Sequence, residues 1–211
     1  MNRNVYFDVC GTLFYENTTF GFVLFYHRKN NNIIRFLYCY ILLSFIGKIL
    51  HRLFGVSLRT LFLSTINGKK KNTLDSVANE YIDYLIENKR IDIVFDIFKS
   101  YIESQSHNVI LLSASIDVVI DALAKRFSIQ YYSSELEYSK GVLKGGIAYD
   151  LKGNKHYILN SDPMSYEFYS DNLDDLPCAS CVDNYYYVVH KTKIDKSKQI
   201  HDQKNIKVLY V

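Results

Sequence analysis

The 211-residue sequence lacks tryptophan, has only two prolines and nine glycines, and carries a net charge of only +3. A charge balance this even gives no support for a nucleic-acid partner, and none is expected. Hydrophobic residues make up 48% and charged residues 22% of the chain, which argues against disordered, collagen-like and repeat classes. A chain of this length can bury one core and carry a small appendage.

Cysteine is also scarce. The chain is too long to need disulfide staples, and no secretory signal precedes its four cysteines, so we expect a reducing, cytoplasmic compartment. Cys178 and Cys181 have the spacing of a redox or zinc site. No second pair of ligands stands at a suitable spacing, which favours ordinary buried thiols for both.

Charge is unevenly distributed along the chain. Between Phe14 and Asp75 there are nine basic and two acidic residues, a local net of +7. The same segment contains an apolar stretch, residues 33–50, whose uninterrupted part is shorter than the ~20 residues needed to span a membrane. Three interpretations stay open for it: a buried core helix, a spanning helix, or an interfacial helix. Basic and aromatic surroundings favour contact with anionic lipid headgroups, at the inner face of the membrane, whereas a small inserted domain needs an apolar core.

Short β-rich runs that end in polar residues predict the main fold. They occupy residues 4–8, 108–113, 166–169, 185–189 and 206–210. A helical pattern over residues 116–127 follows the second run. Alternating strands and helices indicate an α/β fold, a Rossmann-like open parallel sheet whose ligands bind beyond the carboxyl ends of the strands.

A long insertion separates the first two predicted strands. About a hundred residues are too many for one crossover, so an inserted domain is expected. It reads as all-helical, with amphipathic helices over residues 73–88 and 91–102. We predict an α/β core formed by residues 1–14 and 105–211, and a basic, apolar helical domain formed by residues 15–104.

Acidic residues follow two of the predicted strands. Asp8 ends the first strand before a Gly-Thr turn, where its carboxylate can attack phosphorus and form an aspartyl-phosphate. Asp171, Asp174 and Asp175 follow a later strand, and such a cluster beside Asp8 suits Mg²⁺, which prefers oxygen ligands. The alternative for this cluster is a solvated loop that caps the next helix.

Two further strand ends carry groups that can bind phosphate. Ser113 closes the second strand before a helix, so its hydroxyl and the following backbone N–H groups can hold phosphate oxygens, although a plain helix cap is the alternative. The glycine-rich segment from residue 135 to residue 155 has the pattern of a hairpin and leads into a helix that begins near Lys155. A lysine there can neutralise the charge on a phosphoryl group. Lys144 and Lys152 remain alternative candidates.

Taken in order, these segments resemble the four motifs of the haloacid dehalogenase superfamily of phosphohydrolases. The matching segments are residues 7–13, 111–115, 153–155 and 169–177. The resemblance extends over nearly the whole chain, and its most specific parts are Ser-Ala-Ser and Asp-Leu-Pro. A helical insertion between the first two motifs is similar to the IB branch, which includes phosphoserine phosphatases and membrane-associated phosphatidylglycerophosphate phosphatases.

The resemblance implies a role for each motif residue. Asp8 would attack phosphorus, while Ser113 and Lys155 would bind the transferring group. The Asp8 and Asp171 carboxylates, with the backbone carbonyl of Cys10, would hold Mg²⁺. The supporting positions are Thr12, Asn172 and Asp175, of which Asp175 would fix the lysine or the waters of the metal.

Cys10 departs from the family pattern. Phosphatases of this family have an aspartate here, which protonates the leaving oxygen and then activates water. Loss of a positioned acid/base usually costs ~10²- to 10⁴-fold in rate. A thiol with a pKa of about 8.5 can donate a proton but activates water poorly. We therefore expect slow or atypical turnover, and three alternatives stay open: a phosphotransferase, a catalytically impaired binding module at the membrane surface, or an inert thiol at Cys10.

These features together predict a Mg²⁺-dependent phosphomonoester hydrolase that acts through an aspartyl-phosphate on Asp8. The helical insertion would act as a cap that excludes water and selects the substrate. Because the insertion is basic, apolar and aromatic, an amphiphilic, lipid-linked phosphate is expected rather than a small free metabolite. The sequence leaves the oligomeric state open.

Overall fold

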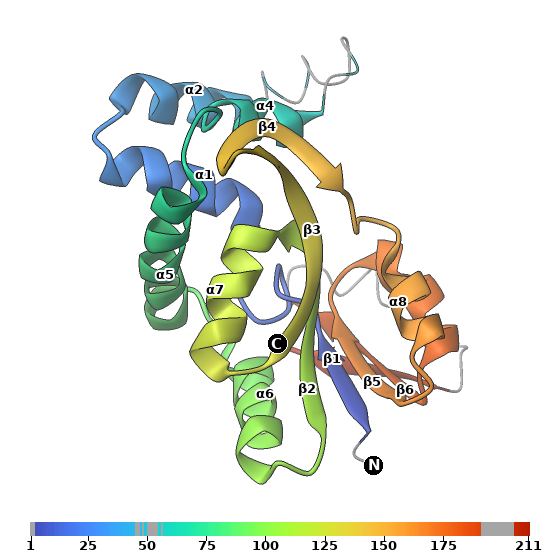
Figure 1. The fold of residues 1–211 in the computed structure, drawn as a ribbon. Coiled ribbons are helices and arrows are strands. Elements are labelled where there is room, and N and C mark those ends of the chain that lie inside the picture. The colour runs from blue at the N-terminus through green and yellow to red at the C-terminus, as the bar shows by residue number, and fades with distance from the viewer. Residues whose placement is uncertain (1–2, 45–46, 48, 50–54, 56, 191–204) are drawn as a thin grey trace.

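A computed structural model describes residues 3–44, 47, 49, 55, 57–190 and 205–211. Within these residues one sheet has the strand order β4-β3-β2-β1-β5-β6-β7 (Figure 1). Its strands are β1 (Asn4–Phe7), β2 (Asn108–Ile116), β3 (Gln130–Ser139), β4 (Val142–Tyr149), β5 (Ser165–Ser170), β6 (Asn184–Val189) and β7 (Ile206–Tyr210). All neighbouring strands are parallel except the antiparallel pair β3 and β4. The predicted α/β fold with an open, mostly parallel sheet is therefore confirmed.

The sheet is covered on both faces because its central strands are apolar on both sides. Val5 and Phe7 of β1 belong to one buried cluster, and Tyr6 between them belongs to the other. Helices α6 (Asp92–Ser104) and α7 (Asp117–Phe127) lie on the first face. Helix α8 (Lys155–Ser161) and the 3₁₀ helix η1 (Leu173–Cys181) lie on the second face (Figure 1).

Two element boundaries differ from those predicted. Strand β2 continues to Ile116 instead of ending at Ser113, so the helix after it begins only at Asp117. The expected hairpin after Glu135 is longer, because β3 already begins at Gln130 and pairs with β2 before it turns into β4. Ser113 consequently lies inside an extended segment four residues before the helix, not at the helix cap.

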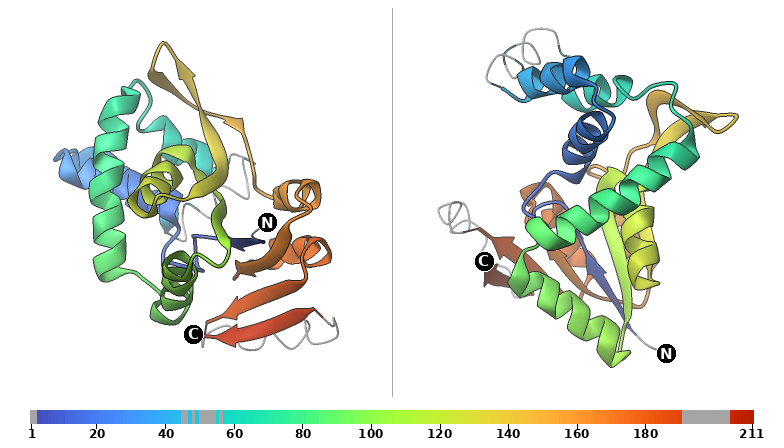
Figure 2. Two further views of the ribbon diagram at one scale, coloured as in Figure 1. Left: turned by 60° about the horizontal axis from the view of Figure 1, so that its bottom comes forward. Right: turned by 90° about the vertical axis from the view of Figure 1, so that its left-hand side faces the viewer.

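Between β1 and β2 the chain forms a helical insertion. Its described helices are α1 (Thr18–Lys29), α2 (Ile33–Leu43), α4 (Leu58–Ser64) and α5 (Lys71–Asn88), and α6 leads back to the sheet. Asn17 caps α1 by accepting from the backbone N–H of Phe20, and Asn32 caps α2 in the same way. The buried face of α5 repeats every three to four residues and packs beside α7 (Figure 2).

The insertion is joined to the hairpin by backbone hydrogen bonds. Gly68 donates to the carbonyl oxygen of Leu143 at 2.9 Å, and Leu143 donates to that of Lys69 at 2.9 Å. Lys71 donates to the carbonyl oxygen of Gly141 at 2.9 Å. The hairpin therefore belongs as much to the insertion as to the sheet, and the boundaries at residues 14 and 104 stay predictions.

Only part of the apolar stretch 33–50 can be described. Residues 33–43 form α2, in which Cys39 and Leu42 are buried, whereas residues 45–46, 48 and 50 lie outside the described residues. No helix in the described part of the chain is long and apolar enough to cross a membrane. All four cysteines are free thiols. Of the two predicted to be buried, Cys178 is buried and Cys181 is only half-buried; Cys39 is also buried.

Candidate active site

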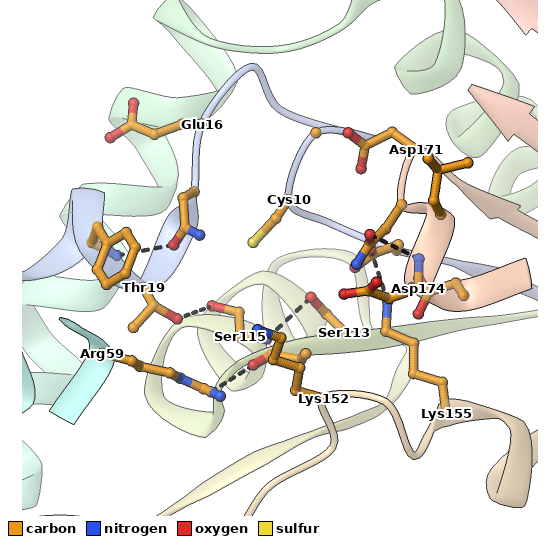
Figure 3. A pocket seen from close by; sticks show the side chains of 18 of the residues that line it. Cys10, Glu16, Thr19, Arg59, Ser113, Ser115, Lys152, Lys155, Asp171 and Asp174 are labelled. Carbon is orange, nitrogen blue, oxygen red and sulfur yellow. Dashed lines mark hydrogen bonds and ion pairs between the residues drawn. The ribbon is translucent and has the colours of Figure 1, made fainter. Parts of the chain in front are cut away.

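A cavity of about 950 Å³ lies at the carboxyl ends of the parallel strands. Asp8 enters it after β1, Ser113 from β2, Asp171 after β5 and Lys155 from the first residue of α8. The residues that sequence analysis selected at separate strand ends thus line one cavity (Figure 3). This follows from the mostly parallel sheet, because its parallel strands end at the same edge.

Asp8, Lys155 and Asp175 form a buried chain of charges. Nζ of Lys155 lies 2.8 Å from Oδ2 of Asp8 and 2.7 Å from Oδ2 of Asp175. Ser170 donates a hydrogen bond to the same Asp175 oxygen at 2.6 Å, and the backbone N–H of Val9 donates to Oδ1 of Asp8 at 2.7 Å. Each buried charge therefore has close partners, as burial demands.

The chain of charges also sets the protonation of its members. Burial raises the pKa of Asp8 to about 6; the positive charge of Lys155 opposes this rise, and the negative charge of Asp175 adds to it. Asp8 is consequently ionised in most molecules at neutral pH. Burial lowers the pKa of Lys155, but Asp8 and Asp175 outweigh that effect and hold it above its ordinary value. The lysine stays charged.

Of the three candidate lysines, only Lys155 reaches Asp8. Its side chain is 3% exposed, whereas Lys152 lines the cavity with an exposed side chain and Lys144 is exposed on β4. Asn172 caps η1, since its Oδ1 accepts from the backbone N–H of Asp174 at 3.1 Å. The loop therefore caps the helix that follows it, and binding of a metal by its carboxylates stays a prediction.

Asp171 is held against the turn that follows β1. Its backbone N–H donates to Oγ1 of Thr12 at 3.0 Å. Gly11 has a φ of +71°, and a Cβ built on it would lie 2.3 Å from Oδ2 of Asp171. His190, which sequence analysis missed, donates from Nε2 to the carbonyl oxygen of Gly11 at 2.7 Å and lies 3.8 Å from Oδ2 of Asp171.

Cys10 is hydrogen-bonded to the first turn of α1. Thr18 donates its hydroxyl proton to Oγ of Ser115 at 2.7 Å, so its Oγ1 is free to accept from the Cys10 thiol at 3.0 Å. The backbone N–H of Thr18 donates to the sulfur at 3.4 Å. Burial raises the pKa of Cys10, and the negative charge of Asp8 adds to the rise. The thiol is therefore protonated at neutral pH.

Arg59 is a second residue that sequence analysis missed. It comes from α4 and donates to Oδ1 of Asp150 at 2.8 Å and to the carbonyl oxygen of Ala114 at 2.6 Å. Its Nε is buried without a hydrogen-bond partner among the described residues. Arg59 and Thr19 lie at the end of the cavity opposite Lys155 and Asp171 (Figure 3). Nothing in the local sequence around Arg59 points to this position.

The donor set of the cavity fits a hard divalent cation. No three His, Cys, Asp or Glu side chains group as a metal site in the described residues. Mg²⁺, however, binds through one or two carboxylates and keeps several waters. Asp8 and Asp171 line the same cavity, and the charge of Asp171 contributes to the raised pKa of Asp8. Lys155 contacts Asp8 and Asp175, and a cation held by Asp8 and Asp171 would offset the repulsion between those two carboxylates.

Comparison with known proteins agrees with this geometry. The sequence model of the haloacid dehalogenase-like hydrolase family matches residues 5–180. Among curated proteins, no sequence matches the chain.

Several solved structures share the fold. A protein of unknown function from Bordetella pertussis Tohama I has a TM-score of 0.73 at 15% identity, and 99% of each chain is covered. A HAD family hydrolase from Salmonella enterica serovar Typhi has a TM-score of 0.60 at 17% identity, covering 96% of this chain and 66% of that one. A phosphoserine phosphatase solved as an analogue of its phospho-aspartyl intermediate has a TM-score of 0.58 at 11% identity, covering 100% of this chain and 93% of that one.

Proposed function

Because this chain belongs to the haloacid dehalogenase-like hydrolase family, we propose that it is a phosphatase that cleaves phosphomonoesters through an aspartyl-phosphate on Asp8. The main support is the contact between Lys155 and Asp8. The lysine lies 2.8 Å from a buried carboxylate that is ionised at neutral pH, in a cavity that also holds Ser113 and Asp171. Phosphatases among the structural neighbours agree with this class of reaction.

In the proposed reaction an Asp8 oxygen attacks phosphorus while the bond from phosphorus to the leaving oxygen breaks. The leaving oxygen takes a proton and departs as an alcohol. Ser113 and Lys155 hold the oxygens of the transferring group. A water molecule then attacks phosphorus, the bond to Asp8 breaks, and the carboxylate is restored as phosphate leaves. Asp175 keeps Lys155 in place through its 2.7 Å contact.

Mg²⁺ is the metal that we propose for this site. Asp8 and Asp171 would hold it through their carboxylates, and Cys10 through its backbone carbonyl. When bound, the ion supplies positive charge beside the phosphoryl oxygens. Thr12 supports Asp171 by accepting its backbone N–H, and Asn172 supports the same loop by capping η1.

We propose that turnover is slow because Cys10 stands where a carboxylate acid/base is expected. Its protonated thiol already donates to Thr18, so a proton for the leaving group must come from this hydrogen-bonded thiol or from water. A thiol with a raised pKa is a poor base toward water in the second step. The same observation favours a second candidate function, a phosphotransferase in which another acceptor resolves the intermediate. A catalytically impaired phosphate-binding module is the limiting case.

We propose an amphiphilic phosphate as the substrate class. The cavity wall includes Phe20, Leu58 and the exposed Tyr15. Arg59, which is paired with Asp150, lies in the same wall away from Asp8. Residues 15–104 would act as the cap that selects such a substrate. A lipid-linked phosphate lies at a membrane surface, so peripheral contact through residues 33–50 at the cytoplasmic face belongs to this proposal.

The decisive experiment is a phosphatase panel run with Mg²⁺ and with a chelator. It includes p-nitrophenyl phosphate, phosphoserine and a lipid phosphomonoester such as phosphatidate. Wild type should release phosphate only with Mg²⁺, and Asp8→Asn should release none. Asp174→Asn is the matched control, because Asp174 lines the same cavity with an exposed side chain and should keep its activity. Equal release by wild type and Asp8→Asn would contradict the proposal.

Slow turnover needs a readout that does not depend on rate. Fluoroberyllate mimics an aspartyl-phosphate, so it should raise the melting temperature of wild type only when Mg²⁺ is also present. Asp8→Asn should show no such shift. Absence of the shift in the wild-type protein would reject an assembled phosphoryl site.

A further inference from the structure

Helix α2 exposes most of its apolar residues to solvent. Ile34 is 83% exposed, Ile33 68% and Leu37 54%, while Tyr38, Tyr40 and Ile41 are also exposed. Isolated exposed apolar residues are normal on a protein surface, but a contiguous group on one short helix marks an interaction site. We call this group, with the basic residues that border it, the α2 surface.

The exposed residues form one continuous arc around the helix. At about 100° per residue, positions 33, 37 and 41 lie along one line, with positions 34 and 38 beside them. The two buried residues, Cys39 and Leu42, lie on the opposite side, where α2 packs against the rest of the insertion. Apolar side chains therefore occupy the outer face of α2 as well as its inner face.

Basic residues border this arc. Arg28 and Lys29 end α1 immediately before α2. Arg35, on α2 itself, points toward the insertion, where its Nη1 donates to the carbonyl oxygen of Thr65 at 2.7 Å. Burial lowers the pKa of His27, and the charges of Arg35 and Lys69 lower it further, so these two charges lie on the inner side of α2 and the basic border consists of Arg28 and Lys29. Residues 17–74 contain no aspartate or glutamate at all. Lys29 has its partner, Glu80, on α5 rather than on the α2 surface.

The position of α2 leaves this face accessible. In both Figure 1 and Figure 2 the helix lies at the outer end of the insertion, on the side away from the sheet. We propose that the α2 surface docks on an anionic lipid bilayer, with its apolar arc in the headgroup region and its basic border against lipid phosphates. This extends the peripheral contact proposed above to a defined helix face and a defined lipid charge.

Charge favours the bilayer over a second copy of this chain. A twofold dimer formed through α2 would bring identical surfaces together. Arg28 would then lie near its own copy with no acidic residue among residues 17–74 to compensate it, whereas Lys29 is already paired with Glu80. An anionic lipid surface provides negative charge along the whole exposed face of the helix.

Vesicle flotation with the full-length protein tests the proposal. Wild type should float with vesicles that contain about one third phosphatidylglycerol or phosphatidylserine, and far less with pure phosphatidylcholine vesicles. Ile34→Glu combined with Ile41→Glu should reduce the floated fraction at least tenfold. Both side chains are more than half exposed, so the fold should survive. Ile93→Glu is the matched control, because Ile93 is 49% exposed on α6, away from α2, and should leave flotation unchanged.

The vesicle-binding measurements test the α2 surface independently of phosphatase activity. Charge reversal at Arg28, with Arg28→Glu, should weaken binding to anionic vesicles and leave the little binding to neutral vesicles unchanged. Failure of wild type to float, or equal flotation of the α2 variants, would overturn the proposal. So would a dimer in analytical ultracentrifugation that the α2 variants convert to monomer. Hydrolysis of p-nitrophenyl phosphate should be the same in all variants, so loss of vesicle binding stays distinguishable from loss of the proposed activity.

Discussion

Gly11 and Asp171 approach so closely that no side chain fits between them. A Cβ at position 11 would lie 2.3 Å from Oδ2 of the aspartate, and the backbone of Gly11 has a φ of +71°. The turn after β1 and the loop after β5 therefore fix each other. In the proposed site this contact determines where the Asp171 carboxylate stands.

We expect Gly11→Ala to abolish Mg²⁺-dependent phosphatase activity, by at least about 100-fold, because the carboxylate must move. Steady-state kinetics and the Mg²⁺ concentration for half-maximal activity would measure it. Gly141→Ala is the control for backbone strain. Gly141 has a φ of +76° with nothing within 4 Å of an added Cβ, so this change should cost only about 1 kcal/mol of stability and keep activity. Similar kinetics for the two variants would argue against a steric role.

Lys155→Met should be both inactive and unstable. It leaves the Asp8 and Asp175 carboxylates buried without their cation, and breaking a buried ion pair in this way costs roughly 3–5 kcal/mol. Urea unfolding monitored by circular dichroism would give the change in the free energy of unfolding. Lys152→Met removes an exposed lysine from the same cavity and should change that free energy by less than about 0.5 kcal/mol. A larger loss of unfolding free energy in Lys152→Met than in Lys155→Met would indicate that Lys152 is the lysine of the site.

Cys10→Asp should increase phosphatase activity. The carboxylate would restore an acid/base group beside Asp8 and Thr18, worth about 10²- to 10⁴-fold where proton transfer limits the rate. The measurement is kcat on p-nitrophenyl phosphate at saturating Mg²⁺. Cys10→Ser controls for loss of the thiol alone and should gain nothing. If Cys10→Asp also gains nothing, the missing carboxyl is not what limits turnover.

Stability should fall below pH 6.5 because of His27. Burial, then the charges of Arg35 and Lys69, lower the pKa of this histidine from 6.5 to about 4 in the folded protein. Nε2 donates to Oγ1 of Thr65, and Nδ1 is buried without a partner in the described residues. Between pH 6.5 and pH 4, His27 is therefore protonated in the unfolded chain but neutral in the folded one. The stability that is present above pH 6.5 is lost as the pH falls toward 4.

Between pH 7 and pH 5 this effect amounts to roughly 2 kcal/mol. Urea unfolding of wild type and His27→Gln at both pH values isolates it, because the glutamine does not titrate. The variant should lose about 2 kcal/mol less than wild type over the interval. Equal losses in the two proteins would contradict the proposed cause.

The strand ends were predictable because parallel strands deliver their last residues to one edge. Asp8, Ser113 and Asp171 are each identified by an apolar run that stops at a polar residue, and they line one cavity. The helix that begins near Lys155 makes it a candidate, but only the 2.8 Å contact with Asp8 in the structure separates it from Lys144 and Lys152. The roles of these residues in catalysis stay predictions.

Contacts made across the fold could not be read from the sequence. Arg59 reaches the cavity only because α4 packs over the hairpin, and His190 only because β6 lies beside β5. Similarly, the outward-facing isoleucines of α2 look like core residues in sequence, because periodicity alone does not say which side of a helix meets the rest of the protein. Tertiary packing decides these positions.

The hairpin that binds the inserted helices also leads directly to the sheet edge that carries the candidate site. Its backbone hydrogen bonds to residues 68–71 lie on a strand that ends only six residues before Lys155. We therefore expect that displacing the insertion would pull on the segment that carries Lys155 and would so link the width of the cavity to the contact between Lys155 and Asp8. A substrate that holds the insertion in place would then also hold Lys155 beside Asp8, where its positive charge can stabilise the phosphoryl group.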